Sequence, residues 1–131
     1  MPIIIDANIA IAWFRADANK LADAALDEIS EHGAVVPALW RWEVQDVLRR
    51  LAREGHLTLS VEAALAEMRQ LPITIDDAVT GLFGDETAIA KKYQLSVYDA
   101  AYLGVALRHR LPLATSDKKL AAAAKIAGAA F

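Results

Sequence analysis

The chain contains no cysteine, no long uninterrupted apolar run and no excess of basic side chains. The absence of cysteine excludes disulfide scaffolds and thiolate zinc sites and favours a reducing cytoplasm. No uncharged apolar stretch reaches the roughly 18 residues of a membrane span, and no basic leader marks a signal peptide. With 14 basic and 17 acidic residues, the net charge of −3 argues against a general nucleic-acid binder.

Several sequence motifs are missing as well. There is no glycine-rich phosphate loop, nucleophile elbow or zinc-binding motif. The three histidines show no ligand spacing, so each is interpreted as a surface or hydrogen-bonded side chain. What remains is a chain of 131 residues, 56% apolar, with a mean hydropathy of +0.26. The length predicts a single domain over residues 1–131, and the apolar excess indicates a buried oligomer interface.

Short apolar segments alternate with longer segments of helical periodicity. Strands are expected at 3–5, 35–36, 73–75, 113–115 and 129–131. Helices are expected at 8–14, 20–30, 42–53, 60–70, 79–93, 96–110 and 118–126. Strands separated by helices predict a mainly parallel sheet covered on both faces, a three-layer α/β/α sandwich.

Four acids lie at the edges of these segments: Asp6 ends a strand, Glu43 opens a helix, Asp99 lies in a first helical turn, and Asp117 follows a strand. Open α/β sheets place ligands at the carboxyl ends of their strands. Carboxylates gathered there repel one another unless a cation neutralises them, and oxygen ligands suit Mg²⁺ or Mn²⁺. The pattern therefore predicts metal-dependent chemistry on a phosphodiester.

Each acid also has a purely structural interpretation. Asp6 and Asn8 are typical of a turn, and Glu43 fits a solvated helix edge. Asp99 lies three residues after Ser96, as in a capping box, and Asp117 is a normal helix N-cap. Capping and metal ligation are compatible. In the functional interpretation, polar neighbours of the acids orient ligands or a metal-bound water; these are Asn8, Thr115 and Ser116.

Taken in order, the motifs resemble those of PIN-domain ribonucleases, in particular the VapC-type toxins of bacterial toxin–antitoxin pairs. The similarity extends over nearly the whole chain. It rests on Ile5-Asp6-Ala7-Asn8, on Glu43 after Val36-Pro37-Ala38-Leu39, on Leu95-Ser96-Val97-Tyr98-Asp99-Ala100, and on Ala114-Thr115-Ser116-Asp117. One departure is Ala7, where the family often has threonine.

The resemblance implies a PIN-like fold and an endoribonuclease dependent on Mg²⁺ or Mn²⁺, located in the cytoplasm. It implies that the metal and the chemistry are carried by the four acids, Asp6, Glu43, Asp99 and Asp117. It further implies a homodimer, an RNA substrate and a cognate antitoxin that inhibits the toxin. No membrane association is expected.

Two other functions are compatible with parts of the pattern. A metal-dependent phosphatase or phospho-acceptor domain could use Asp6, but it would want a second acid two residues later, where Asn8 stands. A catalytically inactive PIN-like interaction module would have no reason to bear the mutual repulsion of four carboxylates.

Overall fold

The computed structural model of the chain describes residues 1–78 and 81–131. The described residues form four strands and seven helices. The strands are β1 (Ile3–Ile5), β2 (Ala34–Val36), β3 (Ile73–Ile75) and β4 (Leu113–Ala114). The helices are α1 (Ala7–Ala12), α2 (Lys20–His32), α3 (Leu39–Arg53), α4 (Val61–Arg69), α5 (Glu86–Tyr93), α6 (Val97–His109) and α7 (Lys118–Ile126).

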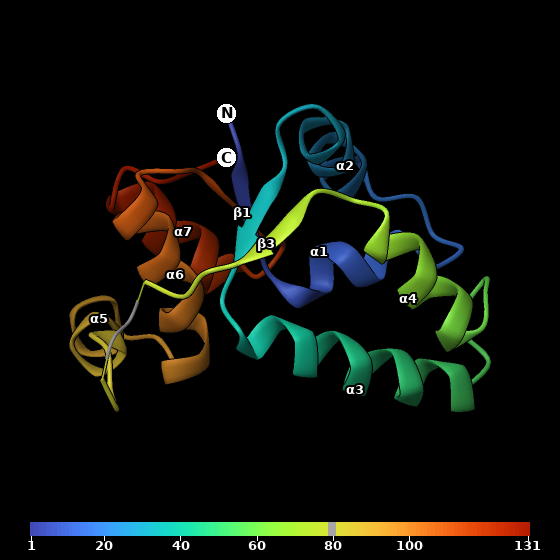
Figure 1. Cartoon of the computed structure of the whole chain (residues 1–131). Helices are drawn as coiled ribbons and strands as arrows, with labels where there is room; N and C mark the ends of the chain where they lie inside the picture. Colours follow the sequence, from blue (N-terminus) through green and yellow to red (C-terminus); the bar gives the residue numbers. More distant parts are fainter. Residues whose placement is uncertain (79–80) are drawn as a thin grey trace.

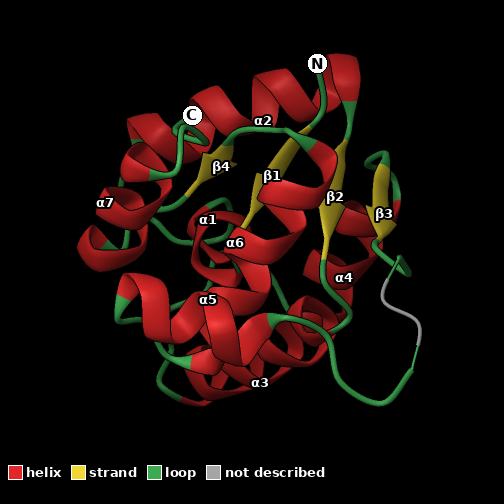
Figure 2. Ribbon diagram, turned by 90° about the vertical axis from the view of Figure 1, so that its left-hand side faces the viewer, coloured by secondary structure: helices red, strands yellow, loops and turns green. Residues whose placement is uncertain are grey.

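All strand pairs in the central sheet are parallel, and the strand order is β3-β2-β1-β4. Helices cover both faces: α5, α6 and α7 lie on one side of the sheet, and α1, α2 and α4 lie on the other (Figures 1 and 2). The predicted three-layer α/β/α architecture is confirmed. The chain runs outward from β1 to β3 and then returns to place β4 on the free side of β1. The switch point of the topology therefore lies between β1 and β4, where such sheets bind ligands.

The core explains why these short strands are stable. Ile3, Ile4 and Ile5 are at most 1% exposed because both faces of β1 are covered. Burial of each isoleucine contributes about 1.5–3 kcal/mol. Gly33 ends α2 with φ of +87° and is required for packing, because a Cβ there would lie 2.8 Å from the carbonyl oxygen of Pro72. This close approach allows β2 and β3 to begin side by side.

Most predicted boundaries differ from the structure by three residues or fewer, as where α3 begins at Leu39 and not at residue 42, and two predictions differ more. The helix expected from residue 79 begins at Glu86; residues 79–80 lie outside the described residues, and residues 81–85 form an irregular segment with bends. Gly81, with φ of +96°, and Gly84 disfavour a helix there. The strand expected at residues 129–131 is reduced to a single parallel bridge between Leu113 and Ala130.

Candidate metal and nuclease site

Asp6 is the single residue between the end of β1 and the start of α1. One of its carboxylate oxygens accepts a hydrogen bond from the Ile9 N–H at 3.1 Å, which caps α1. The other oxygen accepts a hydrogen bond from the hydroxyl of Thr115. The residue is only 7% exposed. Asp6 lies at the sheet edge as predicted, but it caps a helix and does not form the turn that the structural interpretation expected.

Thr115 follows β4, so its bond to Asp6 connects the ends of two adjacent strands. Its hydroxyl oxygen also accepts the N–H of Asp117 at 3.1 Å. Asp117 in turn caps α7 by accepting the N–H of Leu120 at 2.9 Å. The chain around β4 thus holds Asp117 beside Asp6 through one shared hydroxyl. Asp117 itself is exposed to solvent.

Asp99 reaches the same region from α6. Ser96 caps this helix by accepting the Asp99 N–H at 3.1 Å, as the capping interpretation expected. The cap fixes the first turn of α6, and with it the position of the Asp99 side chain. Ala100 is fully buried directly behind Asp99, so α6 packs closely on the sheet at this point.

Glu43 reaches the site from α3, which runs past the carboxyl ends of the strands (Figure 1). Its carboxylate accepts a hydrogen bond from the hydroxyl of Tyr102 at 2.6 Å. Tyr102 lies on α6, one helical turn after Asp99, and is 2% exposed. Burial, this hydrogen bond and the nearby negative charges raise the pKa of Tyr102 far above its usual value. Tyr102 therefore stays protonated, and its neutral hydroxyl donates the hydrogen bond that holds the Glu43 carboxylate.

The pKa shifts show that the acids act on one another. Burial raises the pKa of Asp6, and the charges of Asp99 and Asp117 raise it further, against the hydrogen bonds from Thr115 and Ile9. Burial also raises the pKa of Asp99, together with the charges of Asp117 and Glu43. Lys119 opposes this shift at Asp99. Charges from other segments of the chain therefore help to raise the pKa of both Asp6 and Asp99 at the carboxyl edge of the sheet.

The remaining residues that the sequence singled out divide into two groups. Thr115 is buried and bonded to Asp6, whereas Asn8 and Ser116 are exposed. Asn8 and Ser116 line one pocket together with Arg15 and Asn19. The structure thus brings Thr115 against an acid and places Asn8 and Ser116 at the margin of the acidic region.

The donor set of this region suits a hard cation. The four side chains supply carboxylate oxygens, and burial makes the negative charge on Asp6 and Asp99 costly unless a cation compensates it. In the described part of the chain, no group of three or more acidic or histidine side chains stands close enough to hold a metal ion directly. Metal binding by all four acids therefore stays a prediction.

Three aromatic residues near the acids were not singled out from the sequence. Tyr102 lies in the apolar pattern of α6, and only its spacing of three residues from Asp99 marks it as a neighbour of that acid. Trp42 and Tyr98 directly precede Glu43 and Asp99, and they are 64% and 66% exposed. The Arg41 guanidinium carbon lies 5.3 Å from the centroid of the Trp42 ring.

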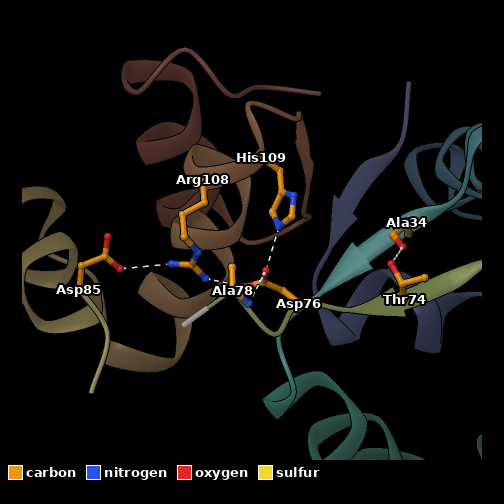
Figure 3. Close-up of polar contacts among 7 residues, drawn as sticks. All are labelled: Ala34, Thr74, Asp76, Ala78, Asp85, Arg108 and His109. Atoms are coloured by element: carbon orange, nitrogen blue, oxygen red, sulfur yellow. Dashed lines mark hydrogen bonds and ion pairs between the residues drawn. The ribbon is translucent and has the colours of Figure 1, made fainter. Parts of the chain in front are cut away.

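Another acid at the same edge of the sheet, Asp76, has different surroundings. Asp76 follows β3, and its oxygens accept hydrogen bonds from Arg108 at 2.7 Å and His109 at 2.8 Å (Figure 3). Arg108 also reaches Asp85 at 3.3 Å. Burial by itself would raise the pKa of Asp76, but the bonds from His109 and Arg108 outweigh it and lower the pKa.

No helix within residues 1–78 and 81–131 has the length and apolarity to span a membrane.

Comparisons with known proteins identify the family. The model of the PIN domain matches residues 3–126. Ribonuclease VapC3 from two strains of Mycobacterium tuberculosis is 32% identical over 122 residues, which span 92% of this chain and 86% of that protein.

Two solved structures share the fold. The crystal structure of PAE2754 from Pyrobaculum aerophilum has a TM-score of 0.71 at 22% identity, over 100% of this chain and 88% of that one. A toxin–antitoxin complex from Klebsiella pneumoniae has a TM-score of 0.62 at 21% identity, over 89% of this chain and 88% of that one. The family match and the VapC3 identity, each spanning most of the sequence, agree with the order of its motifs. The chain therefore belongs to the PIN domain family, among the VapC-type ribonucleases.

Proposed function

We propose that this chain is a Mg²⁺- or Mn²⁺-dependent endoribonuclease that hydrolyses RNA phosphodiester bonds at the region of Asp6, Glu43, Asp99 and Asp117. The observation that carries the proposal is the hydrogen bonding around the acids. The Thr115 hydroxyl joins Asp6 to the backbone of Asp117, and Tyr102, one turn after Asp99, holds Glu43. The raised pKa of Asp6 and Asp99 agrees with this arrangement. Such a group of charges is costly to a folded protein and becomes favourable when a cation binds. The 32% identity to a ribonuclease supports the same chemistry.

In this proposal the four carboxylates hold the metal, which when bound supplies an activated water and compensates charge on the phosphate. Thr115 orients Asp6, and Tyr102 orients Glu43, through the hydrogen bonds described above. Asn8 and Ser116 orient water or substrate at the margin. These neutral donors fix the acids without neutralising them, so the full negative charge stays available to a cation.

Single-stranded RNA fits this surface. Trp42 and Tyr98 present exposed rings on which bases can stack, and each ring adjoins an acid in sequence. Lys119 lies near enough to Asp99 to affect its pKa and can contact a phosphate. A flexible strand can bring one phosphate between these groups.

We further propose that the chain acts in the cytoplasm as the toxin of a toxin–antitoxin pair and forms a homodimer. The similarity in fold to a chain of a toxin–antitoxin complex and the 32% identity to VapC3 support this role. An arginine from an antitoxin could pair with the acids and compete with the metal. A strict monomer in solution, or cleavage unaffected by the protein encoded beside this gene, would contradict these two points and leave the nuclease proposal intact.

The test of the nuclease proposal is an RNA cleavage assay with Mg²⁺, Mn²⁺ or EDTA. Cleavage should require the metal and should disappear in Asp6→Asn. The matched control is Asp27→Asn, which removes an exposed carboxylate from α2 and should leave cleavage unchanged. Metal-independent cleavage, or full activity in Asp6→Asn, would refute the proposal. Hydrolysis of a phosphomonoester instead of RNA would favour the phosphatase alternative.

A further inference from the structure

A polar pocket of about 280 Å³ lies beside the acidic region. Apolar side chains of α1 form part of its lining, and its polar side chains come from α1, the loop to α2, and the segment after β4. These polar side chains are Asn8, Arg15, Asp17, Asn19 and Ser116. The pocket is therefore built from three separate parts of the chain.

Two residues that line this pocket are close to the acids along the chain. Asn8 lies two residues after Asp6, and Ser116 stands between Thr115, which bonds Asp6, and Asp117. A substrate with its phosphate at the acids would have its next nucleotide within reach of this pocket. The position distinguishes the pocket from an ordinary solvated surface hollow.

The lining offers hydrogen-bonding groups that the fold does not use. The side-chain oxygen of Asn19 caps α2 by accepting the Ala22 N–H at 2.9 Å, which leaves its NH₂ group for a ligand. Arg15 and Asp17 are exposed, and neither forms an ion pair within the described parts of the chain. The pocket thus presents a cation, amide donors and a carboxylate acceptor together.

A second pocket, of about 240 Å³, shares Arg15 and Asp17 and extends the surface toward His56. The loop that carries its far wall is fixed, because Thr58 donates both its N–H, at 2.9 Å, and its hydroxyl, at 3.1 Å, to the Phe14 carbonyl oxygen. Arg15 therefore lines two adjoining hollows, the first of which also contains Asn8 and Ser116.

We propose that the first pocket holds the nucleotide that flanks the scissile phosphate, with Arg15 on the RNA backbone and Asp17 and Asn19 at the base edge. This inference rests on the proposed nuclease function. Phosphate contacts position a nucleic acid, and base contacts specify its sequence. Unstacked bases of single-stranded RNA expose the edges that an acid and an amide can recognise. Arg15 is a positioning residue, and Asp17 and Asn19 are specificity-determining residues.

The first experiment separates binding from cleavage. A fluorescein-labelled single-stranded RNA of random sequence is titrated with the full chain in Mg²⁺, with Asp99→Asn present to block cleavage. Adding Arg15→Gln should weaken binding roughly 10-fold and lower the salt dependence by about one phosphate contact. The matched control is Arg110→Gln, which removes an arginine from a pocket at the opposite end of the sheet, beside Met1 and Pro112. It should bind like the parent.

The second experiment tests base recognition in the cleaving protein. Cleavage sites are mapped on total RNA, and kcat/KM is measured for RNAs that differ at one flanking nucleotide. Asp17→Asn exchanges an acceptor oxygen for an NH₂ donor, so it should change the preference at that nucleotide by roughly 10-fold. Asn19→Ser keeps an oxygen to cap α2 and removes the amide, so it should relax the same preference without unfolding the protein.

Three outcomes that count against the proposals are distinguishable. If wild type and Arg110→Gln cleave RNA while Arg15→Gln binds like Arg110→Gln and the flanking preference is unchanged in Asp17→Asn, the pocket assignment is overturned and the nuclease function stands. If wild type cleaves no RNA but Arg15→Gln still binds RNA more weakly than Arg110→Gln, the nuclease function fails and the RNA path stands. Equal binding by those two variants in a protein that does not cleave refutes both.

Discussion

Asp6 and Asp76 each follow a strand at the same edge of the sheet, and the side chain of each is largely covered, yet their surroundings are opposite. Asp76 is bonded by Arg108 and His109, and its pKa is lowered. The described donors to Asp6 are a hydroxyl and an amide, and neighbouring carboxylates help to raise its pKa. One carboxylate is therefore used to hold elements together, whereas the other keeps its charge uncompensated at a cost in stability.

The largest expected difference concerns activity. Asp99→Asn should reduce RNA cleavage on the order of 1,000-fold, because a correctly held cation contributes several kcal/mol to the transition state. Asp76→Asn should reduce it by less than about 10-fold at a temperature where the variant is folded, because its partners are protein side chains. Cleavage rates in Mg²⁺ on one RNA measure both. Equal losses of cleavage rate in Asp99→Asn and Asp76→Asn would show that Asp99 contributes no more to the chemistry than Asp76 does.

The next effect concerns stability without metal. Asp76→Ala should lower the free energy of unfolding by about 2 kcal/mol, because Arg108 and His109 lose their shared acceptor. Asp6→Asn should leave the free energy unchanged or raise it, because it removes repulsion and the Thr115 hydroxyl can rotate to suit the amide. Urea unfolding in EDTA measures both.

The control for Asp76→Ala is Asp85→Ala, which removes the other partner of Arg108. Asp85 has a side chain 57% exposed, so its pair contributes less than about 0.5 kcal/mol. A larger loss for Asp85→Ala than for Asp76→Ala would contradict the role assigned to Asp76.

A smaller effect on stability is expected from Tyr102 on α6, whose hydroxyl donates to Glu43. Tyr102→Phe removes the hydroxyl that holds Glu43 and should lower the free energy of unfolding by about 1 kcal/mol. It should also weaken Mg²⁺ binding, measured by calorimetry, because Glu43 loses its fixed orientation. Tyr93→Phe, on α5, provides the matched control and should leave Mg²⁺ binding unchanged. Unchanged Mg²⁺ binding in Tyr102→Phe would mean that Glu43 needs no such support.

The smallest effect is the pH dependence of stability in EDTA, and it has opposite signs for the two aspartates. The pKa of Asp6 is raised on folding, so its protonation favours the folded state, and this stabilisation is lost as pH rises through the folded pKa. The pKa of Asp76 is lowered, so its stabilisation is present above the ordinary pKa and is lost as pH falls through the folded value.

Melting temperatures measured from acid to neutral pH test these signs. The difference between wild type and Asp6→Asn should move against wild type as pH rises, by a few degrees at most. The difference between wild type and Asp76→Asn should move in favour of wild type over the acidic part of the range. If both differences in melting temperature changed in the same direction with pH, the opposite pKa shifts assigned to Asp6 and Asp76 would be contradicted.

The sequence predicted the layers of the fold because the periodicity of each segment follows directly from burial. Ile3 to Ile5 is apolar throughout, as a strand covered on both faces must be, and Ser60 and Ser96 mark true helix starts. The start of α5 could not be predicted in the same way. Residues before Glu86 carry ordinary helix formers between two glycines, and the backbone preference of glycine decided the outcome.

The acids could be recognised because they stand at segment edges, which a sequence pattern locates. Their partners could not, because those contacts are tertiary. Nothing near Glu43 in the sequence indicates Tyr102, which lies 59 residues away, and nothing near Asp76 indicates Arg108, 32 residues away. The sequence thus predicts where charge gathers, whereas packing decides which charge is compensated.

The bond between Asp6 and Thr115 has a consequence for synthesis of the chain on the ribosome. It joins residues 109 positions apart, and the acid beyond it, Asp117, is added two residues later still. A growing chain carries Asp6 from the start but has no β4 to place beside β1 until almost every other element has emerged. Under the proposed function, nascent or prematurely released chains that lack β4 would be harmless to the RNA of the translating cell.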